Sequence, residues 1–531
     1  MKIAARFENL KEIKKLFPKD FPIIGVGVTA WPRVALAYLL PNFSILSYLE
    51  TSDLEAIRKL CPVVSMEKNL GGIKIEKENT STMLETEEAQ NFFDSSGRNF
   101  PCSRVARWAH MIAREKLALS APNLGLFVYK GTVRIDKIVE ALNLKLMSTA
   151  GVIRNPLENK RIFREELVKA GIEPIQGESL KVKDLSERKW EEFKQQLGEK
   201  LVFQLADSVN GGGAGTFFIR NKQDFRKFRQ IVREKEIKKD KDLEWVNVTK
   251  FIEGEAASII GCVTRYGVVC GRVQKQIIDQ PELGEIDGRA GVWQGHDWIV
   301  DFEEKAQKEA EDLCKKWGEH IYKKGYKGIF GLDVIVSPPL HKAAGGSIVP
   351  IECNARYTGA FPVLTMMQVE QGIMPFDVWH LAEWLGLDYE MDLEEVNKEY
   401  CQPMQGAQLV MHSLEAEEAR VTKKMKAGVY RFGSTESSLR AHACPKGNMI
   451  ARANPTHVCA KIQYVRDGFS LLDLKSKDEF VLADRVVEKG SLLKSRSRMG
   501  RLVFKRKVVD KNGRLLPEIR EVIRQIIDKM L

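Results

Sequence analysis

Paired cysteines and long apolar runs are both missing from this sequence of 531 residues. Its nine cysteines are an odd number, and no two stand at Cys-x-x-Cys spacing, which argues against a disulfide framework and a zinc site. The longest uncharged stretch near the N-terminus, residues 34–49, is broken by Pro41 and Asn42 and falls short of the ~20 apolar residues of a membrane span. The first 20 residues are charged and lack the apolar core of a secretory signal. We therefore expect a cytoplasmic protein without a membrane partner.

Basic residues are in excess in only one segment. The chain carries 83 Lys and Arg against 72 Asp and Glu, a formal net charge of +11. Residues 489–514 contribute +9 of this, so the rest of the chain is nearly neutral. We expect this segment to be a solvated sheet edge that Lys and Arg protect from aggregation. Two alternatives are that it binds a polyanion such as nucleic acid, or that it meets a substrate anion in the active site.

The length exceeds what one hydrophobic core can organise, so we expect several domains. Residues 1–150 alternate short apolar strands with helices, which predicts an α/β sheet of parallel strands. Within them, the polar stretch 67–98 is expected to be a long loop or lid. Residues 151–400 mix longer helices with strands. After about residue 400 the segments shorten between turn signals, which predicts a small β-rich domain, 401–531, that ends in an amphipathic helix.

A glycine-rich turn joins two predicted strands of the middle segment. It contains Gly211, Gly212, Gly213 and Gly215 between the strands 201–206 and 216–219. Glycine exposes backbone N–H groups that can close over phosphates. The turn is therefore either a phosphate-binding loop or a mobile hairpin turn.

Oxygen-bearing side chains cluster in two later strands. Asp333 lies in the apolar run 331–336, and Glu352 and Asn354 share one face at the end of another strand. If the strands pair, these three side chains converge, and hard oxygen ligands suit Mg²⁺ that bridges nucleotide phosphates. Arg356, two residues further on, could reach a phosphate on the same side. The alternative is a set of strand-end carboxylates and a surface arginine.

The glycine-rich turn followed by these carboxylates resembles the ATP-grasp superfamily. Three more motifs extend the resemblance in the same order: Asn159-Lys160 with the later Gly171-Ile-Glu-Pro174, the hinge-like stretch 248–258, and Gln274-Lys275 six residues before Pro281. Glu352-Cys-Asn-Ala-Arg356 also matches the Glu-x-Asn-x-Arg signature of biotin-carboxylase-type members. Together these motifs cover roughly residues 151–385.

The resemblance implies a role for each motif. Lys160 would contact nucleotide phosphate, the hinge near 247–254 would meet adenine through Lys250, Phe251 and Ile252, and the glycine-rich turn would cover the phosphates. Asp333, Glu352 and Asn354 would hold Mg²⁺ or Mn²⁺. Arg356 and Lys275 would act on the acyl phosphate and its transition state. Two positions depart from the pattern, since Gln204 stands where a phosphate-binding lysine is usual and Thr249 where an acidic residue is common.

The fold class that the resemblance implies is α/β. A Rossmann-like domain would precede an ATP-grasp core of two α+β subdomains, with a small β-rich domain at the C-terminal end. The expected activity is ATP-dependent ligation of a small carboxylate to an amine with release of ADP. A bicarbonate-using reaction of the biotin-carboxylase or carbamoyl-phosphate type is one alternative. A non-catalytic ATP-binding protein with a polyanion-binding segment is the other. The sequence leaves open whether the chain forms an oligomer.

Overall fold

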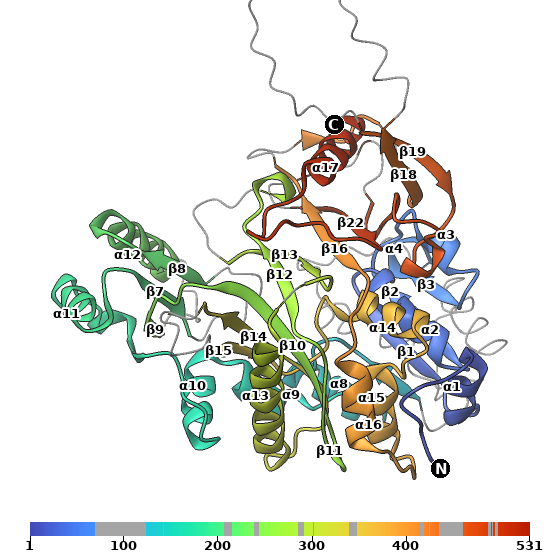
Figure 1. Cartoon of the computed structure of the whole chain (residues 1–531), viewed down its shortest axis with the longest axis horizontal. Coiled ribbons are helices and arrows are strands. Elements are labelled where there is room, and N and C mark those ends of the chain that lie inside the picture. The colour runs from blue at the N-terminus through green and yellow to red at the C-terminus, as the bar shows by residue number, and fades with distance from the viewer. Residues whose placement is uncertain are drawn as a thin grey trace, which may run out of the picture.

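The computed structural model describes residues 1–69, 124–141, 143–206, 215–237, 244–284, 291–300, 302–338, 348–414, 419–423, 425–434, 460–486, 490, 492–493 and 497–531. Most of the stretch 67–98, and Gly211, Gly212 and Gly213 of the glycine-rich turn, lie outside these residues. In Figure 1 a four-stranded sheet lies on the left, a parallel sheet on the right, and a large antiparallel sheet runs between them.

The N-terminal part is a parallel five-stranded sheet in the order β3-β2-β1-β4-β5. Its strands are β1 (Ile23–Gly27), β2 (Phe43–Ser47), β3 (Val63–Ser65), β4 (Gly125–Phe127) and β5 (Lys145–Leu146). Its helices are α1 (Leu10–Leu16), α2 (Val34–Leu39), α3 (Leu54–Ile57), α4 (Met66–Asn69) and α8 (Val133–Ala141). Every residue of β1 and β2 is buried, as expected for strands covered on both faces. The strand order reverses between β1 and β4.

The four-stranded antiparallel sheet has the order β6-β9-β7-β8. Its strands are β6 (Gly177–Lys181), β7 (Leu201–Leu205), β8 (Thr216–Ile219) and β9 (Trp245–Lys250), and it carries α11 (Glu187–Leu197) and α12 (Lys222–Ile237). Aromatic packing joins the helices to the sheet. Trp190 stacks on Phe225 at 5.0 Å, and the edge of Phe225 meets Phe203. This sheet therefore has its own apolar core.

The large sheet has eleven strands and crosses most of the molecule. Its order is β15-β14-β10-β12-β13-β16-β22-β20-β18-β19, and β11 pairs with β10. The strands are β10 (Glu255–Thr264), β11 (Gly267–Cys270), β12 (Gln274–Ile278), β13 (Trp293–Asp297), β14 (Gly328–Val336), β15 (Ile348–Asn354), β16 (Ala407–His412), β18 (Gly428–Ser434), β19 (Ala460–Arg466), β20 (Glu479–Ala483) and β22 (Arg498–Phe504). Two short strands, β17 (Ala419–Arg420) and β21 (Leu492–Leu493), form a separate pair.

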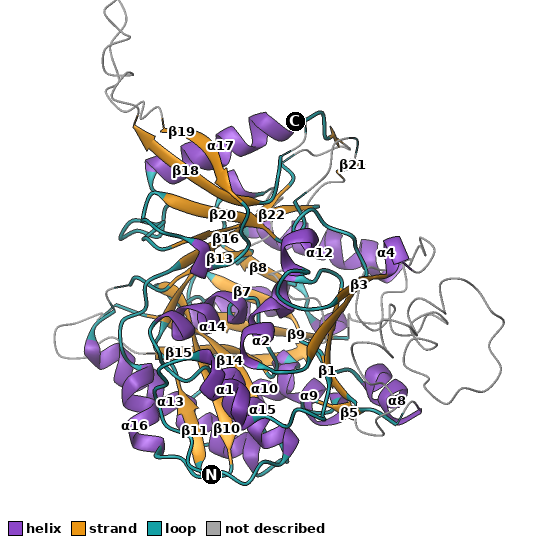
Figure 2. Ribbon diagram, turned by 90° about the vertical axis from the view of Figure 1, so that its right-hand side faces the viewer, coloured by secondary structure: helices purple, strands orange, loops and turns teal. Residues whose placement is uncertain are grey.

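Helices pack around this sheet, and Figure 2 shows α13 and α16 close to β10 and β11. They are α9 (Gly151–Glu158), α10 (Lys160–Lys169), α13 (Glu304–Tyr322), α14 (Phe361–Glu370), α15 (Phe376–Leu385), α16 (Leu393–Tyr400) and the terminal α17 (Pro517–Met530). None of the helices in the described part is long and apolar enough to cross a bilayer. The expected fold class is confirmed. Because β16 pairs with β13, the sheet continues across residue 400, and the domain limits 1–150, 151–400 and 401–531 stay a proposal.

The prediction of an exposed edge within residues 489–514 is wrong for β22. This strand pairs with β16 on one side and β20 on the other, and six of its seven residues are buried. Its arginines, Arg498 and Arg501, bond to the carboxylate of Asp484. The error arose because a strand with basic residues was taken to face solvent, whereas a buried carboxylate from elsewhere in the chain neutralises them.

Candidate active site

A cavity of about 280 Å³ lies where the four-stranded sheet meets the large sheet. One wall comes from the smaller sheet and the other from β10, β12, β14 and β15. Its lining includes Lys160, Ile175, Val202, Gln204, Gly215, Thr216, Phe218, Thr249, Lys250, Phe251, Ile252, Gly254, Ala256, Gln276, Ile278, Asp333, Ile335, Ile351 and Glu352. The structure thus brings together most of the site residues that the sequence suggests, from the start of α10 to the end of β15.

The apolar end of the cavity suits a flat aromatic ring. Val202 and Phe218 from the smaller sheet and Ile335 and Ile351 from the large sheet line it. Phe251, in the link between β9 and β10, meets the ring of Phe218 edge-on at 5.4 Å. An apolar slot between two sheets can hold a planar heterocycle by dispersion and burial.

The hinge backbone is partly occupied by bonds within the protein. The amide of Lys250 donates to the carbonyl of Gln176 at 2.9 Å, and that of Phe251 donates to the carbonyl of Lys200 at 3.1 Å. In this arrangement the amide of Ile252 and the carbonyl groups of the hinge remain available to hydrogen-bond the edge of an adenine ring. Lys250, Phe251 and Ile252 all line the cavity, as the hinge assignment requires.

The polar end of the cavity begins at the N-terminus of α10. Asn159 caps this helix, and its side-chain oxygen accepts from the amides of Arg161 and Ile162 at 3.0 and 3.1 Å. The cap fixes Lys160, whose ammonium lies 3.0 Å from a carboxylate oxygen of Glu352. Gln204 and Gly215 line the same region. The uncharged Gln204 can hydrogen-bond a phosphate there but cannot neutralise it.

Asp333 and Glu352 stand directly opposite each other on β14 and β15. Asp333 accepts from the Asn354 amide at 3.0 Å and from the Gln276 amide at 2.8 Å. Within the described residues no group of three or more His, Cys, Asp or Glu forms a metal cluster. Two carboxylates beside an amide are nevertheless the oxygen donors that Mg²⁺ uses when phosphates complete its shell. The donor set therefore fits this ion.

The pKa values of Asp333, Glu352 and Lys160 are shifted because the three groups are buried close together. Burial, together with the neighbouring charge of Glu352, raises the pKa of Asp333. Burial alone would also raise the pKa of Glu352, but the cation of Lys160 outweighs it and holds that pKa below its usual value. Burial opposes the charge of Lys160, yet Glu352 raises the pKa of this lysine. Arg356 also lowers the pKa of both carboxyl groups, yet the pKa of Asp333 stays raised, so a further cation would stabilise its charged form.

Arg356 lies beside this set without lining the cavity. Its Nη2 donates to the Asn354 side-chain oxygen at 2.6 Å, and its Nε lies 2.9 Å from Glu158. These two bonds fix the guanidinium next to the carboxylates.

Lys275 does not join the other site residues. It lies on the face of β12 opposite to Gln276, since successive strand residues alternate. Its ammonium is 2.6 Å from Glu255 and 3.5 Å from the carbonyl of Lys511. Gln276 faces the cavity instead, and sequence reasoning missed it. Strand alternation shows that only one of the two neighbours can face the cavity, but the sequence does not say which.

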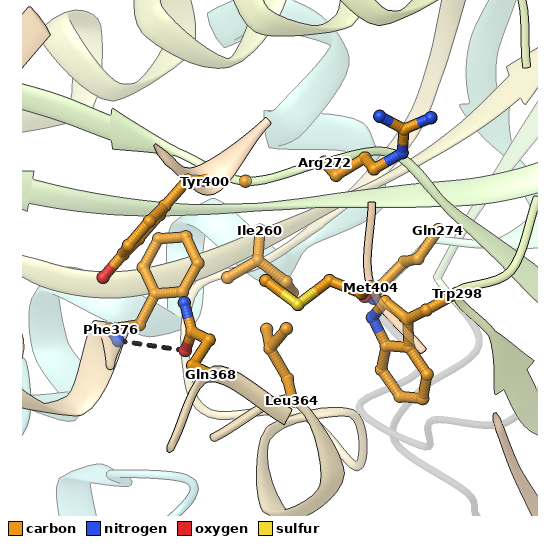
Figure 3. Close-up of a pocket in the computed structure, with 10 residues that line it drawn as sticks. Ile260, Arg272, Gln274, Trp298, Leu364, Gln368, Phe376, Tyr400 and Met404 are labelled. Carbon is orange, nitrogen blue, oxygen red and sulfur yellow. Dashed lines mark hydrogen bonds between the residues drawn. The ribbon is translucent and has the colours of Figure 1, made fainter. Parts of the chain in front are cut away.

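A second, much smaller cavity lies under the large sheet and is shown in Figure 3. Its volume is about 10 Å³, and its walls include Ile260, Leu364, Phe376 and Met404. The side-chain oxygen of Gln368 accepts from the Phe376 amide there at 3.3 Å, while its Nε2 is enclosed without a protein partner. The space is that of one water molecule rather than of a substrate.

Comparison with known protein families gives one match, to the family described as an ATP-grasp domain, over residues 160–360. The matched segment contains the capped lysine, the hinge and both carboxylate strands. A comparison with curated protein sequences found no match.

Solved structures with a similar fold include biotin carboxylase from Campylobacter jejuni, with a TM-score of 0.52 and 13% identity over 97% of this chain and 92% of that one. Phosphoribosylamine–glycine ligase from Thermotoga maritima has a TM-score of 0.52 and 13% identity over 96% and 97% of the two chains. The biotin carboxylase domain of Hydrogenobacter thermophilus 2-oxoglutarate carboxylase, solved with MgADP and bicarbonate, has a TM-score of 0.51 and 13% identity over 91% and 86%. At this identity the likeness shows a shared fold.

Proposed function

We propose that this chain is an ATP- and Mg²⁺-dependent ligase, a proposal that the match of residues 160–360 to the ATP-grasp domain family supports. It activates a small carboxylate as an acyl phosphate, which an amine then attacks, and it releases ADP. The observation that carries the proposal is the cavity between the two sheets. There the apolar slot at Phe251, the ammonium of Lys160 and the facing carboxylates of Asp333 and Glu352 lie in one space.

The reaction needs two displacements. A carboxylate oxygen attacks the γ-phosphorus of ATP, the bond from that phosphorus to the bridging oxygen breaks, and ADP leaves. The amine nitrogen then attacks the acyl carbon, inorganic phosphate leaves, and the amine proton passes to solvent or phosphate. Both steps depend on offsetting charge on the phosphoryl oxygens.

Each residue has a defined part in this scheme. Phe251 and Ile252 hold the adenine, and Lys160 and Gln204 bind the phosphates. Asp333, Glu352 and Asn354 would hold Mg²⁺, which supplies positive charge to the nucleotide phosphates when bound.

Two more groups act at the phosphate end. Arg356 stabilises the acyl phosphate from its position next to Asn354. Gly215, the last residue of the glycine-rich turn, lines the same cavity.

A bicarbonate-using reaction is the second candidate. Two neighbours in fold are biotin carboxylases or domains of that type, and the Glu352-to-Arg356 signature matches that branch. Against it stands the sequence after Arg356, because Tyr357-Thr-Gly-Ala-Phe361 does not continue in the manner of that branch. Lys275 does not separate the two candidates, since either reaction would place it near the transferred phosphoryl group and it bonds here to Glu255.

ADP release separates these candidates. The full-length protein is incubated with MgATP and a matrix of carboxylates and amines, with bicarbonate as a separate arm. The proposal predicts ADP release that needs one carboxylate and one amine together, and loss of that release in Glu352→Gln. Glu191→Gln, a matched change of an exposed residue on α11 that does not line the cavity, should retain activity. Release with bicarbonate alone would favour the second candidate, and no release under any condition would refute both.

A further inference from the structure

A row of buried polar side chains crosses the large sheet, starting at the carboxylates of the cavity. Strand register places these residues on one face of neighbouring strands from β14 to β22. In order they are Asp333, Ser258, Gln274, His296, Gln408 and Arg501.

Hydrogen bonds join neighbours along this row. Gln274 donates to the Ser258 hydroxyl at 2.8 Å, and Arg501 donates to the side-chain oxygen of Gln408. His296 lies 3.4 Å from both Ser258 and Gln408. Burying polar groups is costly unless they are hydrogen-bonded, and these bonds offset that cost along the row. The row leads from the phosphate end of the cavity to a second cluster of charges.

That cluster is centred on Asp484. Its carboxylate accepts from Arg501 at 3.0 Å, from Arg498 at 3.1 Å and from the Thr29 hydroxyl at 2.9 Å. Its backbone amide donates to Asp53 at 2.9 Å, and its φ of +58° is in the left-handed region that non-glycine residues seldom adopt. Such a conformation persists only where the surroundings hold it. Here Thr29, after β1, and Asp53, the N-cap of α3, hold Asp484 from the N-terminal part of the chain.

Arg33 completes the cluster and has no carboxylate partner among the described residues. It is 6% exposed, and its Nε is enclosed without a hydrogen bond. Its guanidinium lies 4.4 Å from the ring centre of Tyr129. On β1, a Cβ on Gly27 would collide with that guanidinium, so glycine is required for it to lie there. A stacked arginine keeps its edge N–H groups for a planar or tetrahedral anion.

Arg33 also lies where open α/β sheets commonly bind ligands. It lies past the carboxyl end of β1, and Tyr129 follows β4, so the pair marks the point where the strand order reverses. Arg33, Arg498 and Arg501 together face one buried carboxylate, Asp484. Burial raises the pKa of Asp53, which lies on the other side of Asp484. Burial lowers the pKa of Arg33 and outweighs the opposing effects of Tyr129 and Asp484.

We propose that Arg33, Arg498 and Arg501, here called the Arg33 cluster, bind an oxyanion of the small-molecule substrate, a carboxylate or a phosphate ester. The polar row then directs the reacting end of that substrate toward Asp333 and Glu352. This inference rests on the proposed ligase function, because it names the substrate class of the same active site. Arg33 supplies the unpaired donors, whereas Arg498 and Arg501 are held in place by Asp484.

Binding of simple anions to the full-length protein tests the cluster without a known substrate. Inorganic phosphate and malonate are titrated by calorimetry into wild type, Arg33→Met and Arg58→Met. The last is a matched loss of an arginine in the same N-terminal part, where Arg58 ends α3 and pairs with Glu50 at 2.7 Å. We expect wild type and Arg58→Met to bind one of the anions equally, and Arg33→Met to bind it at least about tenfold more weakly, as for loss of a charged hydrogen bond.

The outcomes separate this inference from the proposed function. MgADP affinity should be equal in all three proteins, and if wild type binds no MgADP the proposed function fails whatever the anions do. Equal anion affinity in Arg33→Met, or no binding of either anion to wild type, would overturn the inference. If Arg33→Met does not fold, Arg33→Lys replaces it, since lysine keeps the charge but lacks the planar fork, and unaltered affinity there also counts against the cluster. Preference for phosphate over malonate identifies the anion as a phosphate ester.

Discussion

Replacing Lys160 with methionine tests whether this lysine balances the negative charge of Glu352. The lysine lies 3.0 Å from Glu352, and both side chains are largely buried. With an effective dielectric constant of about 20, the gross attraction at that distance is about 5 kcal/mol. Desolvation offsets much of this, and removing one partner of a fully buried pair costs about 3–5 kcal/mol. Because the Glu352 side chain is 27% exposed, we expect a loss of about 2 kcal/mol.

Thermal unfolding measures the loss. For a cooperative unit of about 150–250 residues, 2 kcal/mol lowers Tm by roughly 4–8 °C. MgCl₂ should raise the Tm of Lys160→Met more than that of wild type, since the ion would replace the missing positive charge between Asp333 and Glu352.

A double variant is the internal control. Lys160→Met combined with Glu352→Gln should be more stable than Lys160→Met alone, because it removes both charges instead of leaving one unpaired. If Lys160→Met unfolds at the wild-type temperature, or the added Glu352→Gln change gives no recovery, the charge balance described here is wrong.

Three further changes address the slot, the cap and a distant ion pair. Ala256→Trp, which fills part of the cavity, should weaken MgADP binding at least about tenfold in calorimetry, whereas Val168→Trp on the exposed side of α10 should not. Asn159→Ala should lower the free energy of unfolding in urea by about 1 kcal/mol, since two amides lose their acceptor; an unchanged midpoint would contradict the cap. Glu479→Gln should cost about 2 kcal/mol at pH 7, because hydrogen bonds from Arg466 hold the pKa of Glu479 at about 2. That pKa lies below the unfolded value near 4.5, so the stabilisation is present above pH 4.5 and is lost as the pH falls toward 2; a difference between wild type and variant that stays constant over this range would refute it.

The sequence predicted the parts of the site that depend on local pattern. Asp333 and Glu352 were expected to converge because each lies in an apolar strand, and β14 and β15 do pair with these residues opposite. The hinge was located from the resemblance of residues 248–258 to the ATP-grasp superfamily, and in the structure Phe251 and Ile252 do lie in the link between β9 and β10. The first inference needs only strand length and order, whereas the second needs a known family pattern.

The parts that failed depend on contacts between distant segments. The alternation of β12 places either Lys275 or Gln276 toward the cavity, and the register with β10 and β13 decides between them. The sequence predicts an edge for the basic segment because no sequence pattern marks Asp484 as the residue that neutralises two of its arginines. No sequence pattern indicates that Arg33 is buried, because its burial results from packing between β1 and the segment after β4.

Calorimetric titration of MgADP into the full-length protein, compared with Ala256→Trp and Glu352→Gln, tests the central claim most directly. The account predicts one binding site per chain, weakened by Ala256→Trp at the apolar end and, only when Mg²⁺ is present, by Glu352→Gln at the polar end. Absence of binding to wild type, or binding that neither substitution alters, would contradict the assignment of this cavity to ATP.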